Sequence, residues 1–573
     1  AVGWLGLRGG AAPPAPRRQV VRSHIPPMPG TSLILTDSAG FALSPDGTKL
    51  VYVATTSEGR TALWVRRLDA LAAQSLEGTA GATYPFWSPD SRFVGFFAGS
   101  KLRKIDLTGG PPLTLCDAAD GRGGTWGGTD DILFTPGVNS PIFRVSAAGG
   151  TPAPITTIDP TKNELSNRWP QFLPDGKHFI YLAGSVFTPR ENPTNVIRVG
   201  SLDGKVNKEL VHTHAAAAYA NGYLLYLRMD TLLAQPFDPA TLTLGGAAHP
   251  IADPVPEMAI YSKGLFSVSD NGILAHIEGS STGARKLVWF DRKGQELGSV
   301  SPPDGYASPH LSPDGKRVAF YLDQAGYDVW TYDFDRNVKA PQTFGSRKGF
   351  GNIYPIWSPD GRKIAYGSAR DGRYLMFMKD ADGSSREEVL LEGDDHYRFP
   401  TDWSRDGRTI LFQEGAQGGW SIYTLTLDGD RKPVRYSESN FSQREAAFSP
   451  DGKWIAYCSN ESGEYRVYVA PFPGTGGNWQ VSAAGGSSPR WRRDGRELFF
   501  IAADNRLVAA PITTTATGVE VGALQPLFET RPYGVFGRFD VSADGQRFIV
   551  PYEPGAGATP VTLVVNWPDE LTR

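Results

Sequence analysis

A short motif recurs along the whole chain and sets what the chain can fold into. In its full form it reads Ser-Pro-Asp-Gly, and it is followed by a basic residue and an apolar run. Two residues of this motif, Asp-Gly, occur at Asp46, Asp175, Asp314, Asp360, Asp406, Asp451, Asp494 and Asp544. Asn-Gly replaces them at Asn221 and Asn271, and degenerate forms occur at Asp90-Ser91 and Asp130-Asp131. Twelve occurrences with a mean spacing of about 45 residues are typical of the blades of a β-propeller.

The chemistry of the motif explains why strands flank it. In Ser358-Pro359-Asp360-Gly361, proline presets φ for the first corner of a type I turn, aspartate suits the second, and glycine takes the left-handed position. Strand-forming residues run before the turn, through Tyr354–Trp357, and after it, through Lys363–Tyr366. Two further apolar runs follow, Leu375–Met378 and Glu388–Leu391. Each repeat therefore predicts a four-stranded antiparallel meander.

Composition agrees with an all-β chain and excludes several classes of function. Aromatic residues make up 11% of the 573 residues, and 66 glycines and 45 prolines provide many turns. The net charge of −3 excludes a strongly basic nucleic-acid binder. Two cysteines exclude a disulfide scaffold and a cysteine-based zinc module, and Cys116 and Cys458 are expected to be buried free thiols.

Counting strands predicts how the twelve repeats close. The last repeat has three strands, ending with Val561–Asn566, and an unused strand, Val20–Ile25, precedes the first motif. A single twelve-bladed ring would exceed the usual four to eight blades. We therefore expect two consecutive six-bladed propellers, residues 20–292 and 293–573, after a segment 1–19. Closure of each ring on itself would pair Val20–Ile25 with Leu287–Phe290, and Glu296–Val300 with Val561–Val565.

The motif and the strands after it resemble the TolB-like β-propeller repeat, over roughly residues 20–567. A closer resemblance is to the propeller region that follows the transmembrane helix of certain bacterial serine/threonine protein kinases. The sequences Phe41–Gly47 and Leu563–Trp567 carry it. The apolar start Ala1–Leu7 and the Pro/Ala-rich stretch after it fit a clipped membrane-proximal segment and linker. The resemblance implies an extracytoplasmic module, periplasmic or at the cell surface, tethered to the inner membrane by an upstream helix.

The sequence gives little support for catalysis. Serine peptidases of the prolyl oligopeptidase type carry similar blades but add an α/β-hydrolase domain with a Gly-x-Ser-x-Gly nucleophile elbow. We expect no elbow, because repeats continue to Trp567. Kinase motifs are missing, so kinase activity would need a domain upstream of Ala1. His212-Thr213-His214 is the strongest metal motif and lacks a third ligand nearby, so no metal or other cofactor is expected.

The remaining signal is the residues that enter the innermost strand of each blade. Aromatic and arginine side chains, which are common at binding surfaces, gather there. The candidate ligand-binding residues are Tyr84, Arg168, Trp169, Tyr306, His310, Tyr354, Tyr397, Arg398 and Arg444. We expect a non-catalytic sensor or interaction module that binds a protein, peptide or small ligand on its propeller faces. The alternatives are a stand-alone periplasmic TolB-like scaffold, or a propeller lyase or glycosidase with a site at the channel mouth.

Overall fold

The structure is a computed structural model of the whole chain. It describes residues 19–33, 40–56, 60–162, 164–185, 188, 192–258, 261–278, 285–322, 327–345, 351–370, 373–394, 396–416, 419–474, 476–515, 518–530, 539–552 and 560–571, without the side chains of 32, 301–303, 394 and 416. In these residues the chain is all-β, with twelve antiparallel sheets of four or five strands. The same residues contain no helix long and apolar enough to cross a membrane.

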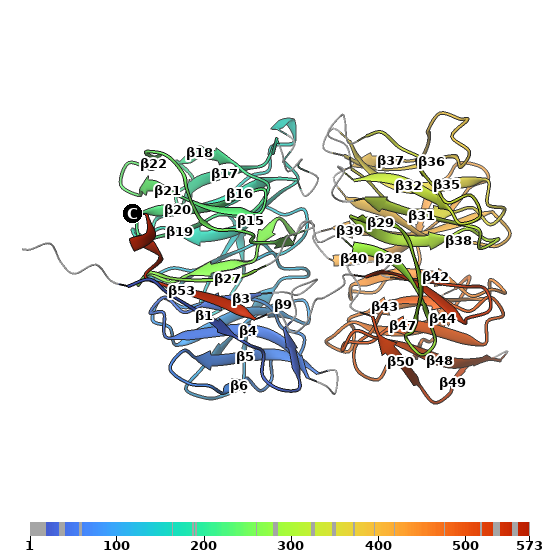
Figure 1. Cartoon of the computed structure of the whole chain (residues 1–573), viewed down its shortest axis with the longest axis horizontal. Coiled ribbons are helices and arrows are strands. Elements are labelled where there is room, and N and C mark those ends of the chain that lie inside the picture. Colours follow the sequence, from blue (N-terminus) through green and yellow to red (C-terminus); the bar gives the residue numbers. More distant parts are fainter. Residues whose placement is uncertain are drawn as a thin grey trace, which may run out of the picture.

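The twelve sheets form two groups that lie side by side in Figure 1. In the first group, the innermost strands β3, β7, β11, β15, β19 and β26 follow one another around an axis, and β26 contacts β3. In the second group, β30, β34, β38, β42, β46 and β51 do the same, and β51 contacts β30. Each group is therefore a closed cycle of sheets.

The strands of the first group are given sheet by sheet from the axis outward. They are β3 (Phe41–Leu43) and β2 (Thr31–Leu33), both beside β4 (Lys49–Thr56), then β5 (Thr61–Arg67) and β6 (Ala73–Ser75); β7 (Thr83–Trp87), β8 (Phe93–Ala98), β9 (Lys101–Asp106) and β10 (Leu113–Asp117); β11 (Gly124–Trp126), β12 (Asp131–Phe134), β13 (Phe143–Ser146) and β14 (Ala153–Pro154); β15 (Ser166–Phe172), β16 (His178–Gly184), β17 (Val196–Ser201) and β18 (Asn207–His212); β19 (Ala218–Ala220), β20 (Tyr223–Arg228), β21 (Thr231–Asp238), β22 (Thr243–Leu244) and β23 (His249–Ala252); β26 (Phe266–Val268), β27 (Ile273–Ile277), β53 (Val561–Val565) and β1 (Val21–Ile25). A hairpin of β24 (Glu257–Met258) and β25 (Lys263–Gly264) and two 3-10 turns, η1 (Pro160–Lys162) and η4 (Trp567–Glu570), accompany them.

The second group is given in the same way. Its strands are β30 (Tyr306–Leu311), β31 (Arg317–Leu322), β32 (Asp328–Asp333) and β33 (Val338–Pro341); β34 (Gly351–Trp357), β35 (Lys363–Arg370), β36 (Arg373–Asp380) and β37 (Glu388–Asp394); β38 (Tyr397–Trp403), β39 (Thr409–Ala416), β40 (Gly419–Thr426) and β41 (Pro433–Arg435); β42 (Gln443–Phe448), β43 (Trp454–Ser459), β44 (Arg466–Pro471) and β45 (Trp479–Gln480); β46 (Ser487–Trp491), β47 (Glu497–Ile501), β48 (Arg506–Thr514), β49 (Val519–Val521) and β50 (Gln525–Glu529); β51 (Asp540–Val541), β52 (Arg547–Tyr552), β28 (Arg285–Asp291) and β29 (Glu296–Asp304).

The repeated turn has the geometry that its residues predict. In the turn between β34 and β35, the Gly361 amide donates to the Ser358 carbonyl at 2.9 Å, and Gly361 has φ of +69°. The Ser358 hydroxyl donates to Asp360 at 2.6 Å, and Asp360 also accepts from the Arg362 amide. These hydrogen bonds hold the pKa of Asp360 below its usual value. The aspartates of the motif therefore serve the turn.

The predicted closure of the two rings is wrong. Strand β1 pairs with β53, from Val21 opposite Val565 to Ile25 opposite Val561, and not with β28. Strand β29 pairs with β28, and β28 pairs with β52, so the second group takes its third and outermost strands from residues before β30. The last strand of the chain, β53, returns to the first group and lies between β27 and β1 (Figure 1, red among blue and green). The first group is thus completed by a strand from the far end of the chain, whereas the strands of the second group all come from residues 285–552.

The apolar core lies between neighbouring sheets. One cluster joins the fifth and sixth sheets of the first group through Leu225, Leu274 and Val564, and Trp567 is fully buried in it. An equivalent cluster joins the fifth and sixth sheets of the second group. Both cysteines are buried free thiols, as expected.

Candidate functional site

Six innermost strands contain a β-bulge at which one residue has positive φ. These residues are Tyr84, Trp169, Ser308, Tyr354, Glu445 and Ser488, with φ between +47° and +56°. Proline follows five of the six. Positive φ is unfavourable for such side chains and is typical of sites where a bulge redirects a side chain. The rings of Tyr84 and Trp169 lie only 5.1 Å apart although they come from different sheets, which fits side chains directed toward the axis.

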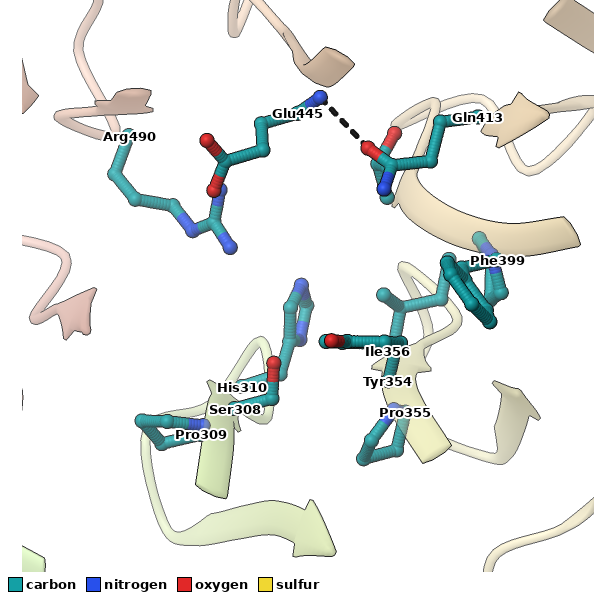
Figure 2. A pocket seen from close by; sticks show the side chains of 12 residues that line it. Ser308, Pro309, His310, Tyr354, Pro355, Ile356, Phe399, Gln413, Glu445 and Arg490 are labelled. Carbon is teal, nitrogen blue, oxygen red and sulfur yellow. Dashed lines mark hydrogen bonds between the residues drawn. The ribbon is translucent and has the colours of Figure 1, made fainter. Parts of the chain in front are cut away.

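A small cavity lies on the axis of the second group (Figure 2). We call it the axial cavity, and its volume of about 30 Å³ is room for about two water molecules. Five innermost strands and β39 line it with Ser308, Pro309, His310, Tyr354, Pro355, Ile356, Phe399, Pro400, Thr401, Gln413, Glu445 and Arg490.

Glu445 is held rigidly in the wall of the axial cavity. Its carboxylate accepts hydrogen bonds from the Ser488 hydroxyl at 2.7 Å and the Ser488 amide at 3.1 Å, which joins β42 to β46. Its own amide donates to Gln413 Oε1 at 2.8 Å, the dashed line in Figure 2. Its side chain is turned toward Arg490 in the same view. The carboxylate of Glu445 is therefore both buried and preorganised.

Further charged groups occur along the same axis. Arg490 lies 3.8 Å from Asp540, and Asp540 accepts the Leu311 amide at 2.7 Å, which links the first and sixth sheets. Asp402 accepts the Phe448 amide, and burial raises the pKa of Asp402 to about 6. Burial lowers the pKa of His310, which favours the neutral imidazole at pH 7.

The axial end of the first group is packed against that of the second. Arg168 donates to the Tyr397 hydroxyl at 3.3 Å, and Asn460 donates to the Ser100 hydroxyl at 2.8 Å. Tyr84 and Tyr354, from opposite groups, belong to one apolar cluster. The strand entries that the sequence analysis singled out therefore lie between the two groups and are covered.

Most of the predicted binding residues meet in this contact. Tyr84, Trp169, Tyr354 and Tyr397 are each less than 9% exposed and belong to the shared cluster. Arg168 is also buried and holds the Val138 carbonyl at 2.9 Å in addition to Tyr397. These side chains form the contact between the groups, and His310 and Tyr354 also line the axial cavity.

The other three predicted residues do not belong to the shared apolar cluster. Tyr306 packs on Phe320 at 5.0 Å in the core between sheets. Arg398 forms an ion pair with Glu414 at 2.6 Å and donates to the Glu392 carbonyl. The guanidinium of Arg444 stacks on Tyr465, 3.8 Å from the ring centroid. None of the three lines the axial cavity.

The expectation about the Gly-x-Ser-x-Gly pattern needs correction, and the structure adds the surroundings of the His212–His214 pair. The Gly-x-Ser-x-Gly pattern does occur once, at Gly279–Gly283, outside the described residues. It lies between β27 and β28, whereas a nucleophile elbow leads from a strand into a helix. His212 is exposed at the end of β18, while His214 is buried 3.0 Å from Glu257. Among the described residues, no three His, Cys, Asp or Glu side chains form a metal site.

Sequence reasoning missed Glu445, Ser488 and Arg490. Their signal is positional: Glu445 and Ser488 occupy the positive-φ position that carries Tyr84 or Tyr354 in other repeats, and Arg490 comes two residues later. Glu445 places a carboxylate where other repeats have a tyrosine, and aligning the repeats of this sequence would have revealed that difference.

Comparison with known proteins shows similarity to TolB-like propellers over part of the chain. Residues 288–434 match the TolB beta propeller domain. Tol-Pal system protein TolB of Francisella tularensis subsp. mediasiatica is 32% identical over 110 residues, 19% of this chain and 25% of that protein. Uncharacterized peptidase YuxL of Bacillus subtilis is 26% identical over 198 residues, 26% of this chain and 29% of that protein. The chain thus spans less than a third of the length of these two relatives.

Solved structures resemble the chain weakly. A putative TolB from Agrobacterium tumefaciens has a TM-score of 0.38 at 18% identity, over 47% of this chain and 99% of that one. TolB from Acinetobacter baumannii has a TM-score of 0.33 at 16% identity, over 70% of this chain and 81% of that one. The family match alone assigns TolB-like propeller sequence, and it does so for residues 288–434.

Proposed function

We propose that the chain is a non-catalytic protein-binding module built from two six-bladed β-propellers. The first propeller is residues 21–277 completed by β53, and the second is residues 285–552. These limits replace the boundaries 20–292 and 293–573, because β53 takes the place expected for β28 in the first propeller, and β28 takes the place expected for β53 in the second. The cyclic contacts of the innermost strands and the TolB-like sequence of residues 288–434 support this proposal.

The observation that carries the proposal is the packing of the two groups against each other. Arg168 and Tyr397 bury the entries that would form an open active-site mouth in a propeller enzyme. The axial cavity holds about two water molecules and leaves no space for a sugar ring or a peptide side chain. Two rings whose facing entries are covered suit a partner that binds on the outer surfaces.

We further propose that the module is extracytoplasmic and belongs to a membrane-tethered serine/threonine kinase. The resemblance of Phe41–Gly47 and Leu563–Trp567 to such proteins supports this placement. A relative named for the Tol-Pal system supports a role in the cell envelope without the kinase. The coding sequence upstream of Ala1 tests the kinase placement directly, because it either encodes a kinase domain and a membrane helix or does not.

The experiment has a binding arm and a turnover arm. The purified chain, tagged and treated with a crosslinker in envelope extract, should capture a discrete protein that binds saturably when both are purified. It should not turn over ATP, peptide or glycoside substrates. A propeller enzyme would instead show turnover that Glu445→Gln abolishes and that Glu520→Gln, at an exposed carboxylate, leaves unchanged. That outcome would replace the binding proposal.

A further inference from the structure

Two turns of the second group break the repeat in the same way. The residue before Asp-Gly is Pro313, Pro359 and Pro450 in the first, second and fourth sheets, and Ala543 in the sixth. In the third and fifth sheets it is Arg405 and Arg493. No arginine occupies this position in the six turns of the first group, which hold Pro45, Pro89, Thr129, Pro174, Ala220 and Asp270. Proline is the residue that the turn itself favours, so the turn does not require arginine.

The turns that carry these arginines form a ring at one mouth of the axis. A Cβ placed on Gly407 would lie 3.7 Å from Pro359 of the preceding sheet, and one on Gly361 would lie 3.6 Å from Pro313. The second, third and fifth turns therefore pack against the turns of the sheets before them. Ser358–Gly361 and its equivalents follow the innermost strands, so this mouth is at the end opposite the contact between the two groups.

The two arginines reach across this mouth. Arg405 Nη2 donates to the carbonyl of Arg493 at 3.1 Å, and Arg493 Nη1 donates to the carbonyl of Pro313 at 3.1 Å. The first, third and fifth sheets of the group are thereby linked. Each guanidinium uses one of its five N–H groups in these bonds, which fixes its position and leaves the others for a ligand.

These two positive charges have no carboxylate partner among the described residues, and both side chains are exposed. The neighbouring aspartates are engaged elsewhere: Asp406 accepts the Ser404 hydroxyl and the Arg408 amide, and Asp494 pairs with Arg492. Burial and the charge of Arg493 lower the pKa of Arg405, which agrees with two guanidinium groups held close together.

We propose that Arg405 and Arg493 form a binding site for a single oxyanion, a carboxylate or a phosphate, at this mouth of the second group. Guanidinium groups bind both anions through paired hydrogen bonds. Asp402, deeper in the axis, attracts Arg405, but one carboxylate does not neutralise two guanidinium groups, and Asp540 faces Arg490. The proposal goes beyond the proposed function, since the site takes a small anion whether or not a protein partner carries it.

The test compares the full chain with variants that restore the repeat. Ligand-observed NMR follows inorganic phosphate in one arm and acetate in the other, with chloride holding the ionic strength constant. We expect saturable binding of at least one anion to the wild-type chain, weakened at least fivefold by Arg405→Pro or Arg493→Pro and abolished by both together. The arm that saturates identifies the preferred anion.

Controls separate this site from a general effect of charge. Arg362→Ala removes an exposed arginine from the neighbouring turn and should change the affinity less than twofold. Arg405→Gln removes the charge without proline, in case a proline variant does not fold, and should weaken binding as Arg405→Pro does. The proposal is overturned if neither anion saturates the wild-type chain, if Arg362→Ala weakens binding as much as Arg405→Pro, or if the double variant binds normally.

Discussion

The return of the last strand, β53, to the first group predicts which half unfolds when that strand is damaged. Val564 lies on β53 and is fully buried in the first group, although it is only nine residues from the end of the chain. Val550 lies on β52 and is fully buried in the second group. The substitutions Val564→Asp and Val550→Asp are chemically identical and 14 positions apart. They should nevertheless destabilise opposite halves of the molecule.

The expected magnitude follows from burial. Replacing a fully buried valine loses about 2 kcal/mol of apolar burial, and an unpaired buried carboxylate adds about 3–5 kcal/mol. The sum of about 5–7 kcal/mol is comparable with the whole stability of a typical domain, about 5–15 kcal/mol. Strand β1 is also affected by Val564→Asp, because its ladder is formed with β53. One group should therefore lose its protection as a unit.

Hydrogen exchange followed by mass spectrometry reads the two groups separately. In the Val564→Asp chain, we expect peptides from β20 and β27 to lose protection while peptides from β35 and β43 keep it. In the Val550→Asp chain, peptides from β47 and β28 should lose protection first. Early loss at β47 in the Val564→Asp chain would refute the placement of β53 in the first group and would support its pairing within the second.

Three further predictions concern single side chains. Arg405→Pro should raise the free energy of unfolding by about 0.4–1 kcal/mol in a urea titration, because proline fits the turn and restricts the unfolded chain. Arg168→Met should lower the free energy of unfolding by about 2–3 kcal/mol, because the buried acceptors at Val138 and Tyr397 lose their donor. Tyr397→Phe should have a smaller effect, and an Arg168→Met chain as stable as the wild-type chain would contradict the role of this contact. Burial raises the pKa of Asp402 to about 6, so its proton stabilises the folded chain at low pH, and that stabilisation is lost as pH rises from about 4 to 6. The urea midpoints at pH 4.5 and pH 7 should therefore differ less in the Asp402→Asn chain than in the wild-type chain.

The local structure of the repeat could be predicted from the sequence because it depends on nearby residues. Proline, aspartate and glycine in Ser358–Gly361 satisfy their own turn, with the serine and aspartate side chains binding amides two to five residues away. The alternation of apolar residues then sets which face of each strand packs on the next sheet. These features need no knowledge of the rest of the chain.

The candidate site was predicted only in part, because the type of a residue does not reveal which other part of the chain packs against it. Aromatic residues and arginines do gather at the entries of the innermost strands, as the sequence indicates. Whether such an entry is open depends on the other group, and the hydrogen bond from Arg168 to Tyr397 joins residues 229 positions apart. Burial of Tyr84 and Tyr354 follows from that long-range packing, which the local pattern does not encode.

The placement of these two strands lies beyond local reasoning for the same reason. Strands β28 and β53 both carry runs of consecutive apolar residues, Leu287–Phe290 and Leu563–Val565, so the local pattern does not decide which one fills the third position of a sheet. The length of the connections does not separate the two closures: residues 278–284 and 553–560 cross between groups, while the longer connection 185–195 joins β16 to β17 within one sheet. The choice is therefore made by the packing of whole sheets. Every ladder of β53 and of β28 lies within one group, so the two groups are joined by the two crossings of the chain and by the buried contact.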